Sequence, residues 1–277
     1  MYAEVNGTKL YYHTAGAGRP LMLMHGGLGL DHTGFLDSFG RLADQAEVIY
    51  YDHRGNGRSQ RYESLGGVTH ETWVADADAL RAHLGHEKII LFGHSYGGFL
   101  AQEYAVRHQD QLAGLILCST APVVDYMDVI QANAGARGTA EQLGALGQAF
   151  SRPMADDADF QTIWKAITPL YFHNYNPAVG EAMDARTSYS AAAWNQVNAN
   201  CLPVFNVLAQ LGQVNVPTLI ISGIDDWITP LKQGGERIHA ALPNSELVVF
   251  DNSGHWPFIE EQEKFVRVVG DWLARLG

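Results

Sequence analysis

Short apolar segments alternate with longer segments of helical spacing along most of the chain. Four apolar segments have the length and composition of buried strands, namely 20–24, 47–51, 89–92 and 112–118. Apolar residues recur at helical spacing in 69–84, and a second helical pattern runs from Ser95 to His108. At the N-terminus, segments 2–5 and 8–12 flank Asn6-Gly7, a dipeptide typical of a tight β-hairpin. These patterns predict a hairpin followed by alternating strands and helices.

The alternation stops near residue 121 and resumes near residue 212. The stretch between is rich in alanine, asparagine and aromatic residues, with prolines at 122, 153, 169, 177 and 203, and it predicts several short helices. Beyond it the chain predicts strand 216–222, helix 231–242, strand 246–250 and helix 260–276.

Strands that alternate with helices form mostly parallel sheets with helices on both faces. We therefore predict an α/β protein with a core domain formed by 1–120 and 212–277. A helical cap, 121–211, is expected to be inserted in that core. A chain of 277 residues, 47% of them apolar, is long enough for one domain with such an insertion.

The charge of the chain limits its partners. It has 18 Lys and Arg residues and 30 Asp and Glu residues, a formal net charge of −12. Nucleic acids and anionic membranes bind basic surfaces, so we expect neither as a partner. The N-terminus shows no signal peptide, and Cys118 and Cys201 form no disulfide framework. A cytoplasmic location is therefore expected, and the sequence does not indicate an oligomeric state.

One stretch carries a motif of nucleophilic catalysis. The apolar segment 89–92 runs into Gly93-His94-Ser95-Tyr96-Gly97, and the helical pattern starts directly afterwards. A strand, a sharp turn and a helix in this order expose a serine at the edge of a sheet. Glycine suits positions 93 and 97 because close strand–helix contact leaves little room for a Cβ atom. Ser95 is therefore the candidate nucleophile.

A serine nucleophile requires a base that a third group orients. Two loops follow predicted strands further along the chain: Gly223-Ile224-Asp225-Asp226-Trp227-Ile228-Thr229-Pro230 and Asn252-Ser253-Gly254-His255-Trp256. Such loops lie at the carboxyl edge of the sheet, where open α/β proteins hold their sites. The order of serine, acid and histidine is one known for catalytic triads. His255 is the candidate base, and Asp225 and Asp226 compete as the acid.

Four blocks together resemble the α/β-hydrolase superfamily, over nearly the whole chain. They are His25-Gly26-Gly27, Asp52-x-Arg54-Gly55-x-Gly57-x-Ser59, the turn around Ser95, and Gly223-x-x-Asp226-x-x-x-Pro230 followed by Gly254-His255. The resemblance implies an α/β-hydrolase fold with a helical cap. It also implies a triad of Ser95, His255 and an acid, and the family's spacing favours Asp226 over Asp225 for that acid.

In such a triad the serine attacks a carbonyl, and the histidine takes its proton and returns it to the leaving group. The acid fixes the imidazole tautomer. The resulting oxyanion needs two backbone N–H groups. We expect them at Tyr96, which follows the nucleophile, and at Gly27 in the His-Gly-Gly turn.

Some neighbouring residues have structural interpretations. His94 is expected to point away from Ser95, and His25 to brace its own loop. A network of Asp52, Arg54 and Arg58 is expected to hold the loop after their strand.

Trp227 and Trp256 are candidates for substrate binding because each adjoins a triad residue. The cap holds many aromatic residues, most of which are expected to pack it against the core, and sequence cannot separate these from residues that line a pocket. The aromatic and methionine positions considered are Tyr126, Met127, Trp164, Tyr171, Phe172, Tyr175, Tyr189 and Trp194.

We expect neither a metal nor a cofactor. The histidines show no H-E-x-x-H or similar ligand spacing and none pairs with cysteine, and no glycine-rich nucleotide motif occurs. The expected partner is a small-molecule substrate with an ester or lactone carbonyl.

Three functions remain open because membership of a superfamily does not define a reaction. The first is hydrolysis of esters or lactones with an apolar acyl part, and a serine nucleophile disfavours the dehalogenase and epoxide-hydrolase branches. The second is release of an N-terminal residue, as in proline iminopeptidases, which the chain resembles around His25, Asp52 and Ser95. The third is a catalytically silent receptor for a small ligand, which an intact triad disfavours.

The iminopeptidase pattern is incomplete in this sequence. Leu28, His53 and His94 stand where those peptidases have proline, glutamine and glycine. A peptidase of that kind also seats an ammonium group against cap carboxylates. The available acids are Asp156, Asp157, Asp159, Glu181 and Asp184. We therefore favour the esterase or lactonase interpretation.

Overall fold

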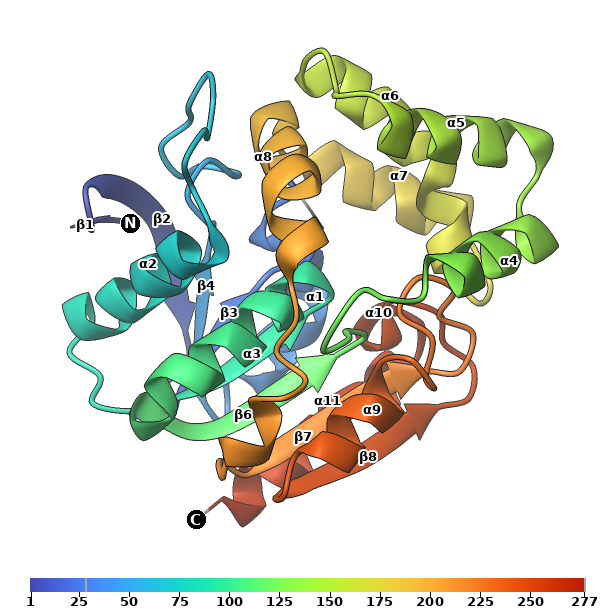
Figure 1. Cartoon of the computed structure of the whole chain (residues 1–277). Helices are drawn as coiled ribbons and strands as arrows, with labels where there is room; N and C mark the ends of the chain where they lie inside the picture. The colour runs from blue at the N-terminus through green and yellow to red at the C-terminus, as the bar shows by residue number, and fades with distance from the viewer. Residues whose placement is uncertain (28, 277) are drawn as a thin grey trace.

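In residues 1–27 and 29–276, which the computed structural model describes, eight strands form one sheet (Figure 1). The strands are β1 (Tyr2–Val5), β2 (Thr8–Ala15), β3 (Pro20–Met24), β4 (Glu47–Tyr51), β5 (Ile89–His94), β6 (Leu112–Cys118), β7 (Thr218–Gly223) and β8 (Ser245–Phe250). Their order across the sheet is β1-β2-β4-β3-β5-β6-β7-β8. β1 pairs with β2 and β2 with β4 in antiparallel fashion, and the later neighbours are parallel.

The mostly parallel α/β sheet predicted from the sequence is confirmed. Asn6 and Gly7 have φ angles of 49° and 70°, as the predicted two-residue hairpin turn requires. β3, β4 and β6 have the predicted bounds, and β5 extends two residues further, to His94. Leu28, one of the departures from the iminopeptidase pattern, lies outside the described residues.

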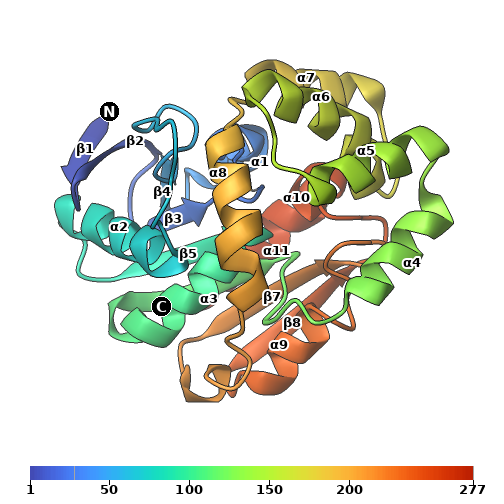
Figure 2. The same cartoon turned by 45° about the horizontal axis from the view of Figure 1, so that its top comes forward.

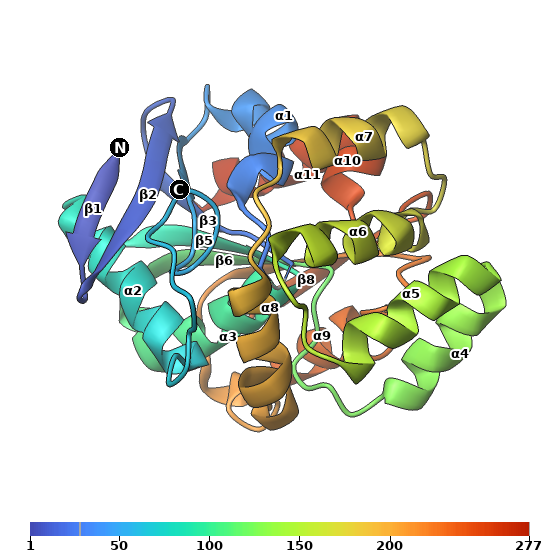
Figure 3. The same ribbon diagram turned by 90° about the horizontal axis from the view of Figure 1, so that it is seen from above.

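Helices cover both faces of the sheet. Those of the core are α1 (Leu36–Phe39), α2 (His70–His83), α3 (Tyr96–His108), α9 (Gly235–Ala241), α10 (Pro257–Glu260) and α11 (Gln262–Arg275). α2, α3 and α9 lie on one face, and α1 and α11 lie on the other (Figures 1 and 3).

Two predicted helices differ from those observed. α9 begins at Gly235 rather than at residue 231, because 231–234 form turns. The predicted helix 260–276 is divided at Glu261, whose φ of −120° and ψ of 51° leave the helical region. The break separates α10 from α11 and turns the Glu260 and Glu261 side chains toward the preceding loop.

An aromatic cluster anchors α10 on the sheet. Phe258 lies 5.4 Å from Phe35 and 5.8 Å from Phe265, measured between ring centroids, and Phe39 lies 4.6 Å from Phe92 of β5. All five side chains are buried. Edge-to-face contacts of this kind stabilise the packing beyond simple burial of area. The helix that follows His255 is therefore held firmly against the core.

The chain between β6 and β7 forms a layer of helices above the carboxyl ends of the strands (Figures 1 and 2). They are α4 (Met127–Arg137), α5 (Ala140–Ser151), α6 (Asp157–Ile167), α7 (Pro177–Arg186) and α8 (Ala191–Gln196), which a π-helical turn (Val197–Cys201) extends. The two ends of this inserted segment meet at a bridge between Val123 and Asn206. No described helix is long and apolar enough to cross a lipid bilayer.

Candidate active site

Ser95 lies at the junction of β5 and α3, on a turn that requires small neighbours. Its φ of 54° and ψ of −120° lie outside the regions that most residues adopt. A Cβ atom on Gly97 would lie 2.1 Å from the carbonyl oxygen of Met24. A Cβ atom on Gly93 would lie 2.5 Å from the carbonyl oxygen of Gly97. Glycine is therefore needed at both positions, as expected from the sequence.

The His-Gly-Gly turn after β3 lies beside this serine. A Cβ atom on Gly26 would lie 3.0 Å from the Cβ of Ser95. Gly26, Gly27, Ser95 and Tyr96 all line one cavity. Tyr96 begins α3, so its N–H has no partner within the helix and lies at the positive end of the helix dipole. The two expected oxyanion donors thus come from segments that flank the serine.

His255 and Asp226 meet at the carboxyl ends of β8 and β7. Nδ1 of His255 donates a hydrogen bond of 2.8 Å to Oδ2 of Asp226, and both side chains are buried. A proton on Nδ1 leaves Nε2 of the neutral imidazole free to accept another. His255 and Ser95 line the same cavity. The structure therefore brings the predicted nucleophile and base to one space.

Thr229 holds the Asp226 carboxylate and was missed by the sequence analysis. Its hydroxyl donates to Oδ2 at 2.6 Å, and the N–H groups of Ile228 and Thr229 donate to Oδ1 at 3.1 and 3.0 Å. Burial acts to raise the pKa of Asp226, but His255 and these hydrogen bonds outweigh it and lower the pKa below its usual value. The sequence signal that could have identified Thr229 is its position three residues after Asp226, because an aspartate side chain often accepts hydrogen bonds from the residues that follow it in an Asx-type turn.

Asp225, the alternative acid, has a different partner. Within the described residues its carboxylate contacts Nδ1 of His173 in the inserted segment, and its side chain is 44% exposed. Adjacent aspartates thus point to different imidazoles. The buried pair is Asp226 with His255, and Asp226 remains the proposed acid.

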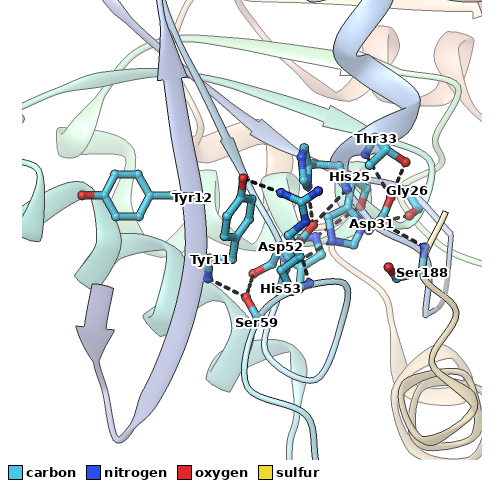
Figure 4. A network of polar contacts seen from close by, with 12 residues as sticks. Tyr11, Tyr12, His25, Gly26, Asp31, Thr33, Asp52, His53, Ser59 and Ser188 are labelled. Atoms are coloured by element: carbon cyan, nitrogen blue, oxygen red, sulfur yellow. Dashed lines mark hydrogen bonds and ion pairs between the residues drawn. The ribbon is translucent and has the colours of Figure 1, made fainter. Parts of the chain in front are cut away.

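His94 and His25 support the backbone around the site. Nε2 of His94 donates to the carbonyl oxygen of His255 at 2.9 Å, and burial holds the pKa of His94 well below its usual value. Nε2 of His25 accepts the N–H of His53 at 3.2 Å, so its Nδ1 donates to the carbonyl oxygen of Gly26 at 3.0 Å (Figure 4). Both histidines brace loops, as expected.

Asp52 organises the loop that follows β4 (Figure 4). Its Oδ1 accepts the N–H and Nδ1–H of His32 at 3.0 and 2.7 Å, and its Oδ2 accepts the N–H of Arg58 at 2.8 Å. Arg54 instead forms an ion pair of 2.7 Å with Asp76. The expected network of Asp52, Arg54 and Arg58 therefore divides into two neighbouring clusters.

Asp31 joins the core to the inserted segment. Its Oδ1 accepts the N–H and hydroxyl of Thr33 at 2.9 and 2.6 Å, and its Oδ2 accepts the N–H of Ser188 at 2.8 Å (Figure 4). Close by, the N–H of Ser190 donates to the carbonyl oxygen of Gly29 at 2.8 Å. These bonds hold α8 near the His-Gly-Gly turn.

A cavity of about 210 Å³ lies between the sheet and the inserted helices. All the cap positions considered from the sequence line it except Phe172. Further apolar side chains complete the wall and had no distinguishing sequence signal: Leu30, Phe35, Phe99, Val124, Ile130, Phe150, Met183, Leu202, Ile228, Phe258 and Ile259. A concave and mostly apolar space that reaches a few polar groups is typical of small-molecule sites.

The two tryptophans proposed for substrate binding have different surroundings. Trp256 lines the cavity and stacks on Tyr171, with ring centroids 5.4 Å apart. Among the described residues that line the cavity, Trp227 is absent and its neighbour Ile228 is present. Trp227 is buried, and its ring centroid lies 5.3 Å from that of Tyr171. The same turn points the Asp226 side chain at His255 and packs the Trp227 ring against Tyr171.

Most acids of the inserted segment already have partners. Asp184 accepts from Gln161 and Tyr189, both at 2.9 Å, and pairs with Lys165 at 3.0 Å. Of the other acids considered from the sequence, Asp156 caps α6, Asp157 pairs with Arg61, and Asp159 pairs with Arg152. Glu181 is exposed and lines the cavity.

Known proteins share this architecture. Residues 19–262 match the alpha/beta hydrolase fold family. A proline iminopeptidase from Clostridium botulinum is 30% identical over 96% of this chain and 95% of its own. An esterase from Exiguobacterium antarcticum has a TM-score of 0.82 at 24% identity and covers 99% of this chain and 98% of its own. A thermophilic esterase from Thermogutta terrifontis has a TM-score of 0.75 at 26% identity, with coverage of 100% and 98%.

The family match extends over most of the sheet, the serine turn and the histidine loop. The chain therefore belongs to the alpha/beta hydrolase fold family. Its relatives by sequence and its neighbours by structure carry different activities in their names, so the family identifies the class of protein rather than the substrate.

Proposed function

We propose that this protein is a serine hydrolase that cleaves carboxylic esters or lactones with an apolar acyl part. Ser95 Oγ attacks the carbonyl carbon, and His255 Nε2 takes the serine proton. The leaving oxygen takes that proton, so that an ester releases its alcohol, a lactone opens to a hydroxyl on the acyl group, and in both cases an acyl-enzyme remains on Ser95. Water then attacks the acyl-enzyme, with His255 again as the base, and releases the acid.

Asp226 supports this reaction by accepting the Nδ1–H of His255. This bond fixes the tautomer that leaves Nε2 free and stabilises the imidazolium that forms. Because Thr229 and two backbone N–H groups hold the carboxylate, it needs little reorganisation during the reaction. The N–H groups of Gly27 and Tyr96 are the proposed donors to the oxyanion.

The mostly apolar wall of the cavity that Ser95 and His255 share is the observation that supports the substrate class. An apolar acyl chain gains about 0.8 kcal/mol for each buried CH₂ group. An ester also has a better leaving group than an amide, so this site requires less help from substrate-specific contacts.

A second candidate is an aminopeptidase that releases an N-terminal residue. The proline iminopeptidases among the relatives favour it. Such an enzyme needs carboxylates that are free to bind an ammonium group. Here Asp184 is occupied by Lys165 and two further donors, Asp157 and Asp159 are paired with arginines, and of the acids considered Glu181 remains exposed at the cavity. We therefore rank this activity second.

A rate panel separates the two candidates. The panel contains nitrophenyl esters from acetate to decanoate, an acyl lactone and a prolyl arylamide. We expect kcat/KM for the esters to rise by up to about fourfold for each CH₂ group until the cavity is full, and then to fall. The arylamide should react slowly or not at all. A better rate with the arylamide, abolished when its amino group is acylated, would replace our proposal with the peptidase.

A further inference from the structure

The loop that carries His255 lies between the inserted segment and the acid loop, the loop 223–230 that carries Asp225 and Asp226. The N–H of Asp225 donates to the carbonyl oxygen of Ser253 at 3.1 Å. On the other side, the N–H of His255 donates to the carbonyl oxygen of Tyr171 at 2.7 Å. A Cβ atom on Gly254 would lie 2.5 Å from that same oxygen. Segment 171–174 therefore rests directly on the backbone of the histidine loop.

One carboxylate connects these two segments. Glu260, the last residue of α10, accepts the N–H of Gly254 on Oε2 at 2.7 Å. Its Oε1 accepts the N–H of His173 at 2.6 Å and contacts that of Asn174 at 3.4 Å. Burial raises the pKa of Glu260 above its usual value, although these N–H groups favour the charged form. The carboxylate therefore sits largely out of water, between a core loop and the inserted segment.

Glu261, the residue that follows Glu260, also binds the loop that carries His255. Glu261 Oε2 accepts the N–H of Asn252 at 2.9 Å and the hydroxyl of Ser253 at 2.8 Å. Lys264 lies 3.6 Å from its other oxygen. Within the described residues, all these partners belong to the core. Two adjacent glutamates thus hold the same loop, and the Glu260 carboxylate bonds also to segment 171–174.

We propose that Glu260 is a positioning residue that couples the docking of segment 171–174 to the placement of the His255 imidazole. This inference rests on the proposed function. Glutamate can accept from both segments at once, because each carboxylate oxygen is an acceptor. A glutamine has one acceptor oxygen, and its NH₂ group would face an N–H donor. The substitution therefore releases either the core loop or the inserted segment.

The test compares Glu260→Gln with Glu261→Gln in nitrophenyl ester hydrolysis. A misplaced catalytic group costs up to about 100-fold in rate. We expect Glu260→Gln to lower kcat by about 10-fold to 100-fold with KM within about twofold of wild type, the signature of a lost transition-state interaction. Glu261→Gln should keep kcat within about threefold of wild type, although it should lose about as much thermal stability as Glu260→Gln. Hydrogen exchange at the His255 amide should accelerate in the first variant only.

Equal effects of the two substitutions on kcat, or a wild-type kcat in Glu260→Gln, would overturn the inference. Ser95→Ala separates this failure from failure of the proposed function. If Ser95→Ala keeps its turnover, the serine mechanism is wrong whatever Glu260 does. If Glu260→Gln does not fold, Glu260→Asp is compared with Glu261→Asp by the same measurements. Aspartate keeps the charge but is too short to reach both segments.

Discussion

The sheet core and the inserted helices both contribute to the cavity, but they do so in different ways. In the core, polar side chains form defined pairs at the ends of the strands, as Asp226 does with His255. In the inserted segment, aromatic residues line the cavity and pack the layer at the same time, as Trp164 and Tyr171 do at a ring separation of 5.2 Å. In the proposed function the core therefore supplies the reacting groups, and the inserted segment shapes the cavity.

Two aspartates show this difference most clearly. Asp226 and Asp184 both lie near the cavity, and both accept several hydrogen bonds. Asp226 faces the imidazole of His255, whereas Asp184 faces the ammonium of Lys165. A carboxylate becomes a candidate for catalysis through the group that it orients.

Replacing the core nucleophile is expected to have the largest effect. Ser95→Ala should lower kcat for a nitrophenyl ester by on the order of 10⁶, because the triad acts as a unit. The thermal unfolding curve should stay close to that of wild type, since the change removes one oxygen atom at the cavity wall. Labelling with a fluorophosphonate checks the assignment. A second labelled residue together with retained activity would move the nucleophile elsewhere.

The adjacent aspartates of the acid loop provide a matched pair. Asp226→Asn should lower kcat by on the order of 10⁴, because an amide favours the wrong imidazole tautomer. Asp225→Asn should cost much less, since its carboxylate contacts His173 and is 44% exposed. Ester hydrolysis at saturating substrate measures both. The reverse ranking would transfer the role of acid to Asp225.

The smallest effect is expected at Glu181, an exposed acid of the inserted segment that lines the cavity. Glu181→Gln should change kcat/KM for an ester by less than about twofold, because a solvent-exposed carboxylate interacts only weakly with other charges and an uncharged ester offers it no cationic partner. Glu141→Gln, an exposed change on α5 outside the cavity, is the control. A large and selective loss of prolyl arylamide hydrolysis in Glu181→Gln would instead favour the aminopeptidase.

Much of the core could be predicted because its signals are local. A strand, glycines two positions to each side of a serine, and a helix follow one another in the sequence and mark the turn at Ser95. The same holds for the Asn6-Gly7 hairpin and for strands such as β3 and β6, whose bounds agree with the apolar segments. Local periodicity and backbone sterics are properties of consecutive residues, so a sequence displays them directly.

The rest depended on which distant segments meet. Trp227 and Ile228 are neighbours in the sequence, yet Ile228 lines the cavity while Trp227 packs against Tyr171. Glu260 and Glu261 look equivalent, and only the break between α10 and α11 sends one carboxylate to the inserted segment and the other to the core. The sequence by itself determined the sheet, the serine turn and the order of the chemical groups. The tertiary structure decided which apolar side chains line the cavity and which carboxylates are occupied, because those outcomes depend on contacts between residues far apart in the chain.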